Sequence, residues 1–324
     1  MIFNNTIRFF GSHCASAVLT LLCSTAFCLS VSHAQVATPA WQFSQGDQYQ
    51  VETTKLSKRT STLDSRITTI ESEVVMLFDW TITAVDDAGT ATVEQELKRF
   101  SIDIGDPAVP LQAIEYASDS VPNDLPAAMR KLQRKSKPLI GLKCIIQMAS
   151  NGKVGSVELD PDSQKKLDKL ENSPNLKALF SEESLKQMSD DFSLNAIPAD
   201  ADPAGWSKTQ TQQGGFGEVS IDHKFSIGPV ETIKGRKLIA IDVASSLTPS
   251  TDAEGSQTKK PAAKNEITQS LTSMTGNGSI TFDVDGNYFS ASQFKTRMKS
   301  ERKYREKVIK TSLENETRIK TEKK

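Results

Sequence analysis

Residues 73–85 read EVVMLFDWTITAV, and this stretch decides the fold class. Its apolar and polar side chains alternate, as expected of a strand with one buried face. One face carries Val74, Met76, Phe78, Trp80 and Ile82, and the other includes Asp79, Thr81 and Thr83. The turn sequence Asp86–Gly89 follows directly, so the stretch predicts one arm of an antiparallel hairpin.

The same period of two continues along the chain after this turn. Residues 90–97 form the returning strand, with apolar side chains at odd-numbered positions. Phe100, Ile102 and Ile104 are at even-numbered positions, and this change predicts a β-bulge near Lys98-Arg99. Asn151-Gly152 separates two further alternating runs, and it is a strong hairpin signal.

More strands are expected in the second half of the chain. Residues 219–227, 238–243, 279–284 and 288–294 show strand patterns, and Asp285-Gly286-Asn287 predicts a hairpin turn. In residues 309–319, the uncharged residues at odd-numbered positions alternate with charged or polar residues. This pattern favours a C-terminal edge strand, with a helix as the alternative. Residues 245–265 form a low-complexity tract of Ser, Thr, Lys, Pro and Ala, expected to be a long mobile loop.

A helical pattern interrupts the strands between residues 162 and 191. Phe180 before Ser181, with Leu185 four residues after the Ser, predicts a hydrophobic staple around a helix N-cap. Strands, a helical middle and more strands together predict an α+β fold that is predominantly antiparallel β-sheet with a helical insert. We therefore expect a signal peptide at 1–34, a β-rich half at 35–160, a helical segment and linker at 161–200 and a second β-rich half at 201–324.

The first 34 residues have the pattern of a cleavable secretory signal peptide. Arg8 precedes an uncharged apolar stretch from residue 14 to 31, and Ser32-His33-Ala34 supplies the small residues that signal peptidase accepts. We expect cleavage between Ala34 and Gln35, and hence a periplasmic or extracellular protein with no stable membrane span after cleavage. An uncleaved anchor is the alternative, disfavoured because Ser and Thr dilute the stretch and no basic stop-transfer cluster follows.

Composition limits the partners and the means of stabilisation. Cys144 is the only cysteine outside the signal, so no internal disulfide can form and the fold must rely on burial. Removing the signal leaves 38 basic and 40 acidic residues, and this near-neutral balance does not favour nucleic acid as a partner. Residues 295–324 carry 12 basic and 5 acidic side chains, a pattern that favours a solvated strand face over a surface for anionic partners.

The sequence offers no clear catalytic, cofactor or metal site. His223 is the only histidine after the signal, and Cys144 shares its strand face with apolar residues, so we expect a buried thiol and no Cys–His pair. One His and one Cys cannot supply the usual zinc ligands, and the Asp283–Asn287 segment departs from the calcium-loop spacing. Paired carboxylates, as in glycosidases, stay open as an alternative.

The order of several short motifs resembles an uncharacterised family of exported bacterial proteins that is classified only as a domain of unknown function. The motifs are turn and strand features: Trp41-x-Phe43-x-x-Gly46-Asp47, Asp79-Trp80-x-Ile82-x-x-Val85-Asp86, Asn151-Gly152-Lys153-Val154, Phe180-Ser181-Glu182-Glu183 and the Pro-rich stretch ending at Trp206. The resemblance implies an exported, strand-rich fold, and it supplies no catalytic residues.

These observations favour a non-catalytic binding or interaction protein. In its sharper form, a curved sheet covered by residues 162–191 carries a lipid-like, apolar small molecule. The alternatives are a structural component that binds an envelope protein, and a carboxylate-dependent hydrolase.

Overall fold

The computed structural model describes residues 39–108, 114–119, 136–170, 205–214, 217–248, 267–304 and 307–324, with isolated positions between 130 and 202. The chain divides into two units, Met1–Gln35 and Val36–Lys324. The predicted signal and its cleavage site, Ala34–Gln35, lie outside the described residues. No helix among the described residues has both the length and the apolar character needed to span a membrane.

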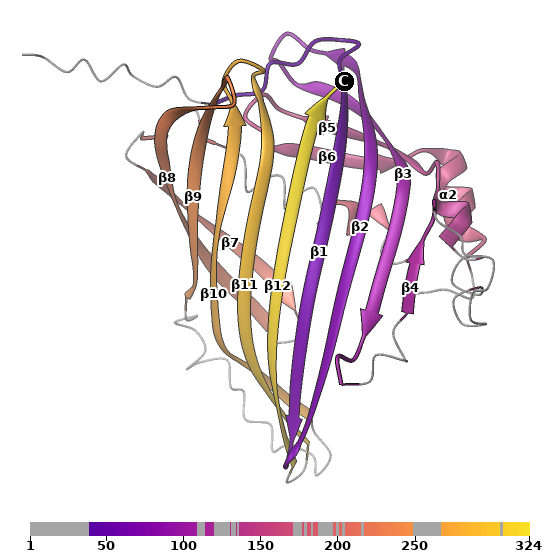
Figure 1. Ribbon diagram of the computed structural model, residues 1–324, viewed down its shortest axis with the longest axis vertical. Helices are drawn as coiled ribbons and strands as arrows, with labels where there is room; N and C mark the ends of the chain where they lie inside the picture. Colours follow the sequence, from indigo (N-terminus) through magenta and orange to yellow (C-terminus); the bar gives the residue numbers. More distant parts are fainter. Residues whose placement is uncertain are drawn as a thin grey trace, which may run out of the picture. The chain divides into compact units, whose positions relative to one another are not determined.

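Twelve strands of the described residues form one antiparallel sheet, which confirms the predicted fold class. The strand order is β6-β5-β3-β2-β1-β12-β11-β10-β9-β8-β7, and β4 pairs with β3 beside this path (Figure 1). The strands are β1 (Gln48–Leu63), β2 (Arg66–Val85), β3 (Ala91–Gly105), β4 (Ile114–Ala117), β5 (Lys143–Met148), β6 (Val154–Leu159), β7 (Trp206–Gly214), β8 (Gly217–Ile233), β9 (Arg236–Thr248), β10 (Ile267–Asp283), β11 (Tyr288–Tyr304) and β12 (Lys307–Lys323).

Short helical elements occupy the middle of the chain, as predicted. Helix α2 (Pro161–Asp168) is capped by Asp160, whose carboxylate accepts the Ser163 N–H at 3.0 Å, and a 3-10 helix, η2 (Lys137–Leu139), precedes β5. Ser181 caps a second helical turn by accepting the Ser184 N–H at 3.2 Å. Phe180 and Leu185 are both buried beside it, as the predicted staple requires. Much of the remaining 162–191 segment lies outside the described residues.

The predicted bulge and hairpins are present. In the β2–β3 pairing, Leu77 is opposite Arg99 and Phe78 is opposite Leu97, so Lys98 is the extra residue. The β5–β6 hairpin turns at Gly152, whose φ of 87° lies in the left-handed region that glycine adopts readily. The β10–β11 hairpin turns over Asp285–Asn287, where Gly286 donates its N–H to Asp283 at 2.9 Å.

The C-terminal strand is central, so the prediction of an edge strand is wrong. β12 pairs with β1 from Tyr49–Lys323 to Leu63–Ile309 and with β11 on its other side. The alternating pattern shows one buried face, but it does not reveal how many neighbours a strand has. The charges that suggested an exposed edge instead pair across neighbouring strands, as between Arg297 and Glu314 at 3.0 Å. Residues on either side of the predicted boundary near 201 therefore contribute to one sheet.

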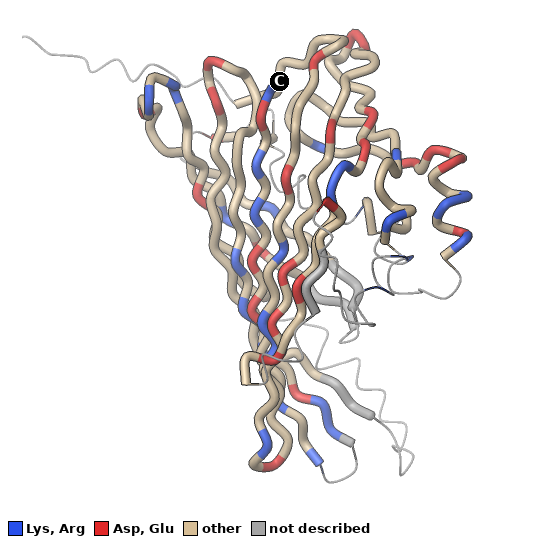
Figure 2. Tube along the Cα trace, turned by 45° about the vertical axis from the view of Figure 1, so that its right-hand side comes forward, with Lys and Arg blue, Asp and Glu red and all other residues tan. Residues whose placement is uncertain are grey.

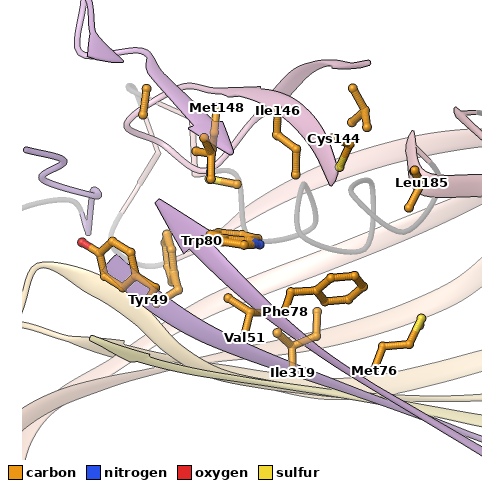
Figure 3. Close-up of a cluster of buried hydrophobic side chains, with 14 of the residues drawn as sticks. Tyr49, Val51, Met76, Phe78, Trp80, Cys144, Ile146, Met148, Leu185 and Ile319 are labelled. Atoms are coloured by element: carbon orange, nitrogen blue, oxygen red, sulfur yellow. The ribbon is translucent and has the colours of Figure 1, made fainter. Parts of the chain in front are cut away.

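One face of the sheet, which we call the core face, carries the hydrophobic core at one end of the strands. Trp80, Tyr49 and Val51 lie there, with aliphatic side chains of β5 above them (Figure 3). Trp41 closes this end: its ring contacts Tyr49, and its backbone N–H donates to the Ser150 carbonyl oxygen at 2.7 Å. Other core residues come from β8 to β12, so the sheet bends around a shared interior.

The opposite face, which we call the charged face, carries most of the ionisable side chains of the central strands. Figure 2 shows basic and acidic residues distributed along these strands. Lys58 of β1 pairs with Glu71 of β2 at 2.7 Å, on the opposite parity from the buried residues of the same strands. Alternation thus separates an apolar face from an ionic one across the middle of the sheet.

Candidate functional site

Beyond the packed core, the core face continues as a row of residues that crosses eight strands, and all of them except a glycine on β10 carry polar side chains. Each member is the register partner of the next, and the row contains one buried histidine and one lysine. We call this set the polar row: Ser72, Ser57, Asn315, Thr296, Gly276, Ser245, His223 and Lys208, in order from β2 to β7. Its members on β1, β11 and β12 are only half-buried, so the core there is not closed.

An aliphatic row lies two residues further along each strand, away from the packed end. Leu313 pairs with Met298, which pairs with Met274, and all three side chains are half-buried. Leu247 and Ile221 continue the row on β9 and β8. Arg59 on β1 is its charged member, and its Nε donates to Ser61 Oγ at 3.4 Å. The core face therefore presents partly exposed apolar side chains on the far side of the polar row.

Phe294 separates the polar row from the packed core. A side chain on Gly278 of β10 would lie 2.7 Å from Phe294 Cδ2, and one on Gly276 would lie 3.0 Å from its Cζ. The ring thus occupies space over β10 that only glycine leaves free. Its centroid is 6.1 Å from that of His223, so an aromatic surface connects β11 to β8.

His223 is the most deeply buried titratable member of the polar row. Its side chain is 2% exposed, and its Nδ1 lies 2.6 Å from the Oγ of Ser245 on β9. Burial lowers the pKa of His223, and the positive charge of Lys208 lowers it further against the opposing effect of Asp222. The imidazole is therefore neutral at physiological pH. Its Nε2 has no hydrogen-bond partner in the described part of the chain.

A second buried donor lies on the neighbouring edge strand. The Nε1 of Trp206 on β7 also has no hydrogen-bond partner among the described residues. The Trp206 ring stacks on Phe225 with centroids 4.8 Å apart and planes inclined by 2°, and the ring centroids of Phe225 and His223 are 6.3 Å apart. Trp206 and His223 therefore both lie next to the Phe225 ring, and each has a buried nitrogen without a hydrogen-bond partner among the described residues.

The Ser245–His223 pair has the elements of a nucleophile and a base, but its geometry does not favour catalysis. Ser245 is 7% exposed, so its hydroxyl is poorly placed for an incoming substrate. A catalytic histidine is usually oriented by a third group, and within the described residues nothing occupies that place at Nε2. The pair is better understood as a hydrogen bond that fixes the imidazole.

Cys144 does not join His223. Its thiol, 1% exposed on β5, accepts a hydrogen bond from Gln95 Nε2 at 3.3 Å, and Gln95 Oε1 accepts one from Trp80 Nε1 at 2.8 Å. Burial raises the pKa of Cys144 to about 12. The thiol is thus part of the packed core, and seven strands separate β5 from β8, the strand of His223, in the sheet order.

The charged face contains a hollow of about 720 Å³ that crosses β10, β11, β12, β1, β2 and β3. Its charged side chains already pair with one another, as Lys58 with Glu71 at 2.7 Å and Lys295 with Glu316 at 3.4 Å. The hydrogen bond from Arg318 lowers the pKa of Glu316, which keeps that carboxylate ionised. An acid catalyst needs the opposite shift. We therefore place the candidate site on the core face.

Comparisons with known proteins identify no family for this chain. No family model and no curated protein matches it. Among solved structures, a lipovitellin chain, determined in work on lipid–protein interactions, shares 8% identity with this chain at a TM-score of 0.45. The match covers 86% of this chain but only 25% of the lipovitellin chain. An outer membrane channel from Pseudomonas putida F1 shares 8% identity at a TM-score of 0.23, with 87% and 97% covered. A DUF1329 family protein from Desulfovibrio piger shares 7% at 0.12, with 82% and 83% covered.

These are distant structural matches, and no family model supports the expected membership of an uncharacterised exported family. The chain spans about a quarter of the length of the lipovitellin chain.

The sequence singled out His223 and Cys144, and the structure places them on β8 and β5 without bringing them together. Asp283 lies in the predicted hairpin, where it accepts a hydrogen bond from Arg236 Nε at 2.7 Å. Among the described residues no group of three metal-binding side chains is found.

The sequence pattern does not single out Ser245, because this residue begins the low-complexity tract that is expected to be a loop. The strand β9 in fact extends to Thr248, while residues 249–266 lie outside the described part. The pattern that does indicate it is the alternation of Ile239, Ile241 and Val243. Ser245 and Leu247 continue this alternation at the same spacing of two residues.

Proposed function

We propose that this chain is an exported, non-catalytic binding protein that holds an amphipathic, lipid-like ligand on the core face of its sheet. The observation that carries the proposal is that the core face is only partly covered beyond the packed core. Beyond the packed core, Phe294 and the aliphatic-row side chains of β10, β11 and β12 are half-buried, whereas the opposite face of the same strands carries paired charges. A sheet face that served only as part of the hydrophobic core would be covered by other side chains.

The chemistry of the core face fits a ligand with both apolar and polar parts. Each methylene group that a ligand buries against Met298 or Leu313 contributes about 0.8 kcal/mol. The polar row supplies hydroxyl, amide and imidazole groups within one side chain's reach of those apolar residues. Such a combination of apolar lining and a few polar groups is typical of small-molecule sites.

Export is the second part of the proposal and rests on the signal sequence. We expect the protein isolated from the periplasm or the medium to begin at Gln35, and intact-mass measurement decides the point. A mass that includes residues 1–34 would contradict cleavage.

The binding function is tested by organic extraction of the purified protein followed by mass spectrometry. We expect a stoichiometric amphipathic molecule in the extract, and a native mass spectrum in which the same mass adds to the protein. Protein that is free of such a molecule, and that binds no long-chain amphiphile when offered, would contradict the proposal and favour a structural envelope component. Turnover in a hydrolase substrate panel, abolished by replacing one carboxylate of the charged face, would contradict the non-catalytic assignment.

A further inference from the structure

Two buried nitrogens at one side of the core face point to the polar part of the ligand. His223 Nε2 and Trp206 Nε1 are each without a hydrogen-bond partner among the described residues. Buried polar groups in proteins are nearly always satisfied, and an unsatisfied one lowers stability. Two of them on adjacent strands, both against Phe225, therefore call for an external acceptor.

The chemistry of that acceptor follows from the groups around it. The indole nitrogen of Trp206 is a donor only. When Ser245 donates to Nδ1, the neutral imidazole of His223 carries its proton on Nε2, which then also donates. Lys208 is the register partner of His223 on the core face and adds positive charge nearby. Two donors beside a cation favour anionic oxygen over a neutral or cationic group.

An apolar path leads away from these donors along the sheet. Phe294 lies 6.1 Å from His223 between centroids, and Met298 and Leu313 follow on β11 and β12. From Phe294 to Met298 the path follows β11 for four residues, which is roughly 13 Å at the usual rise per residue. A hydrocarbon chain can extend over this distance along the strand. The half-buried ring of Trp206 on the edge strand β7 borders solvent and offers the side of entry.

We propose that His223 Nε2 and Trp206 Nε1 bind the anionic oxygen headgroup of a single-chain amphiphile, whose hydrocarbon part lies along Phe294, Met298 and Leu313. This assignment rests on the proposed binding function and names the ligand class. A long-chain carboxylate and a single-chain phospholipid share the required headgroup chemistry.

The test compares a fluorescent polyene fatty acid with its methyl ester. The acid should bind at least roughly tenfold more tightly, because its charged oxygens accept hydrogen bonds that the ester accepts poorly. Trp206→Phe removes one donor but keeps the ring on Phe225. It should weaken acid binding roughly tenfold, leave ester binding unchanged and not lower the melting temperature of the ligand-free protein.

Trp80→Phe is the matched control, because the donor of Trp80 is already used by Gln95 in the core. This variant should lower the melting temperature and leave the acid-to-ester ratio unchanged. His223→Leu should reduce the ratio, whereas His223→Gln, which keeps a donor near Nε2, should retain part of it. Competition by an unlabelled long-chain acid against a lysophospholipid identifies which headgroup source is preferred.

The outcomes separate the two proposals. Equal binding of acid and ester, unaffected by Trp206→Phe, would overturn the headgroup assignment while the binding function stands. Failure of both probes and of the lysophospholipid to bind would overturn the binding function and the headgroup assignment with it.

Discussion

The Nδ1 of His223 lies 2.6 Å from the Oγ of Ser245, across the β8–β9 register. This contact holds the one histidine of the described chain in a fixed orientation on the core face. It also leaves Nε2 as the free position of the ring, which is the basis of the headgroup assignment.

The first prediction is that acid destabilises the protein through His223. Because burial lowers its pKa below the usual value of about 6.5, the unfolded chain takes up a proton more readily than the folded one. The free energy of unfolding should therefore be insensitive to this group above about pH 7 and fall as the pH drops below about 6.5. Lys208 on β7 and Asp222 on β8 are the charged groups that act on it. Denaturant titrations between pH 7.5 and 5.5 measure the effect.

His223→Gln is the control for this prediction, since it cannot titrate in that range. The difference in unfolding free energy between wild type and variant should shrink with falling pH. Parallel curves for the two proteins would show that His223 is not the titrating group.

The second prediction concerns the close approach of Phe294 to β10. Gly278→Ala forces a methyl group against Phe294 and the Gln293 carbonyl, and should destabilise the protein by about 1–3 kcal/mol. Gly155→Ala on the edge strand β6 is the matched control. A methyl group there finds its nearest neighbour at 3.7 Å, and the change should be neutral or stabilising by about 0.5–1 kcal/mol. Equal effects of the two substitutions on the denaturation midpoint would contradict the assigned role of Gly278.

Much of the fold follows from the sequence because alternation and turn chemistry are local. The EVVMLFDWTITAV stretch becomes the paired middle of β2, the bulge at Lys98 follows from the change of parity, and Asn151-Gly152 makes its turn. Each of these depends on neighbours within a few residues.

The features that the sequence did not reveal depend on pairing between distant segments. The β1–β12 ladder joins residue 49 to residue 323, and no local pattern encodes it. The polar row is equally non-local, because His223, Ser245 and Asn315 become neighbours only once the register of several strands is set. Polar residues within a low-complexity tract also hid Ser245, although its parity matched the strand before it.

The third prediction is that Cys144 is unreactive in the native protein. Its thiol is buried and its pKa is raised to about 12, so the reactive thiolate is scarce at pH 8. A maleimide or aromatic disulfide should react more than about a hundredfold more slowly than with free cysteine. Full denaturation should restore the ordinary rate, which serves as the control. Labelling of the native protein at the rate of free cysteine would place the thiol outside the core.

The account is tested most directly by two substitutions at adjacent positions of β11 that lie on opposite faces of the sheet. Met298→Gln puts an amide into the aliphatic row, whereas Lys299→Gln changes the charged face only. The dissociation constant of the fluorescent fatty acid, measured by fluorescence titration after circular dichroism has verified both folds, should rise about tenfold for Met298→Gln, because the amide replaces apolar surface beneath the bound chain. It should stay within about twofold of wild type for Lys299→Gln. The same dissociation constant for Met298→Gln as for wild type, or a larger loss for Lys299→Gln, would contradict binding on the core face.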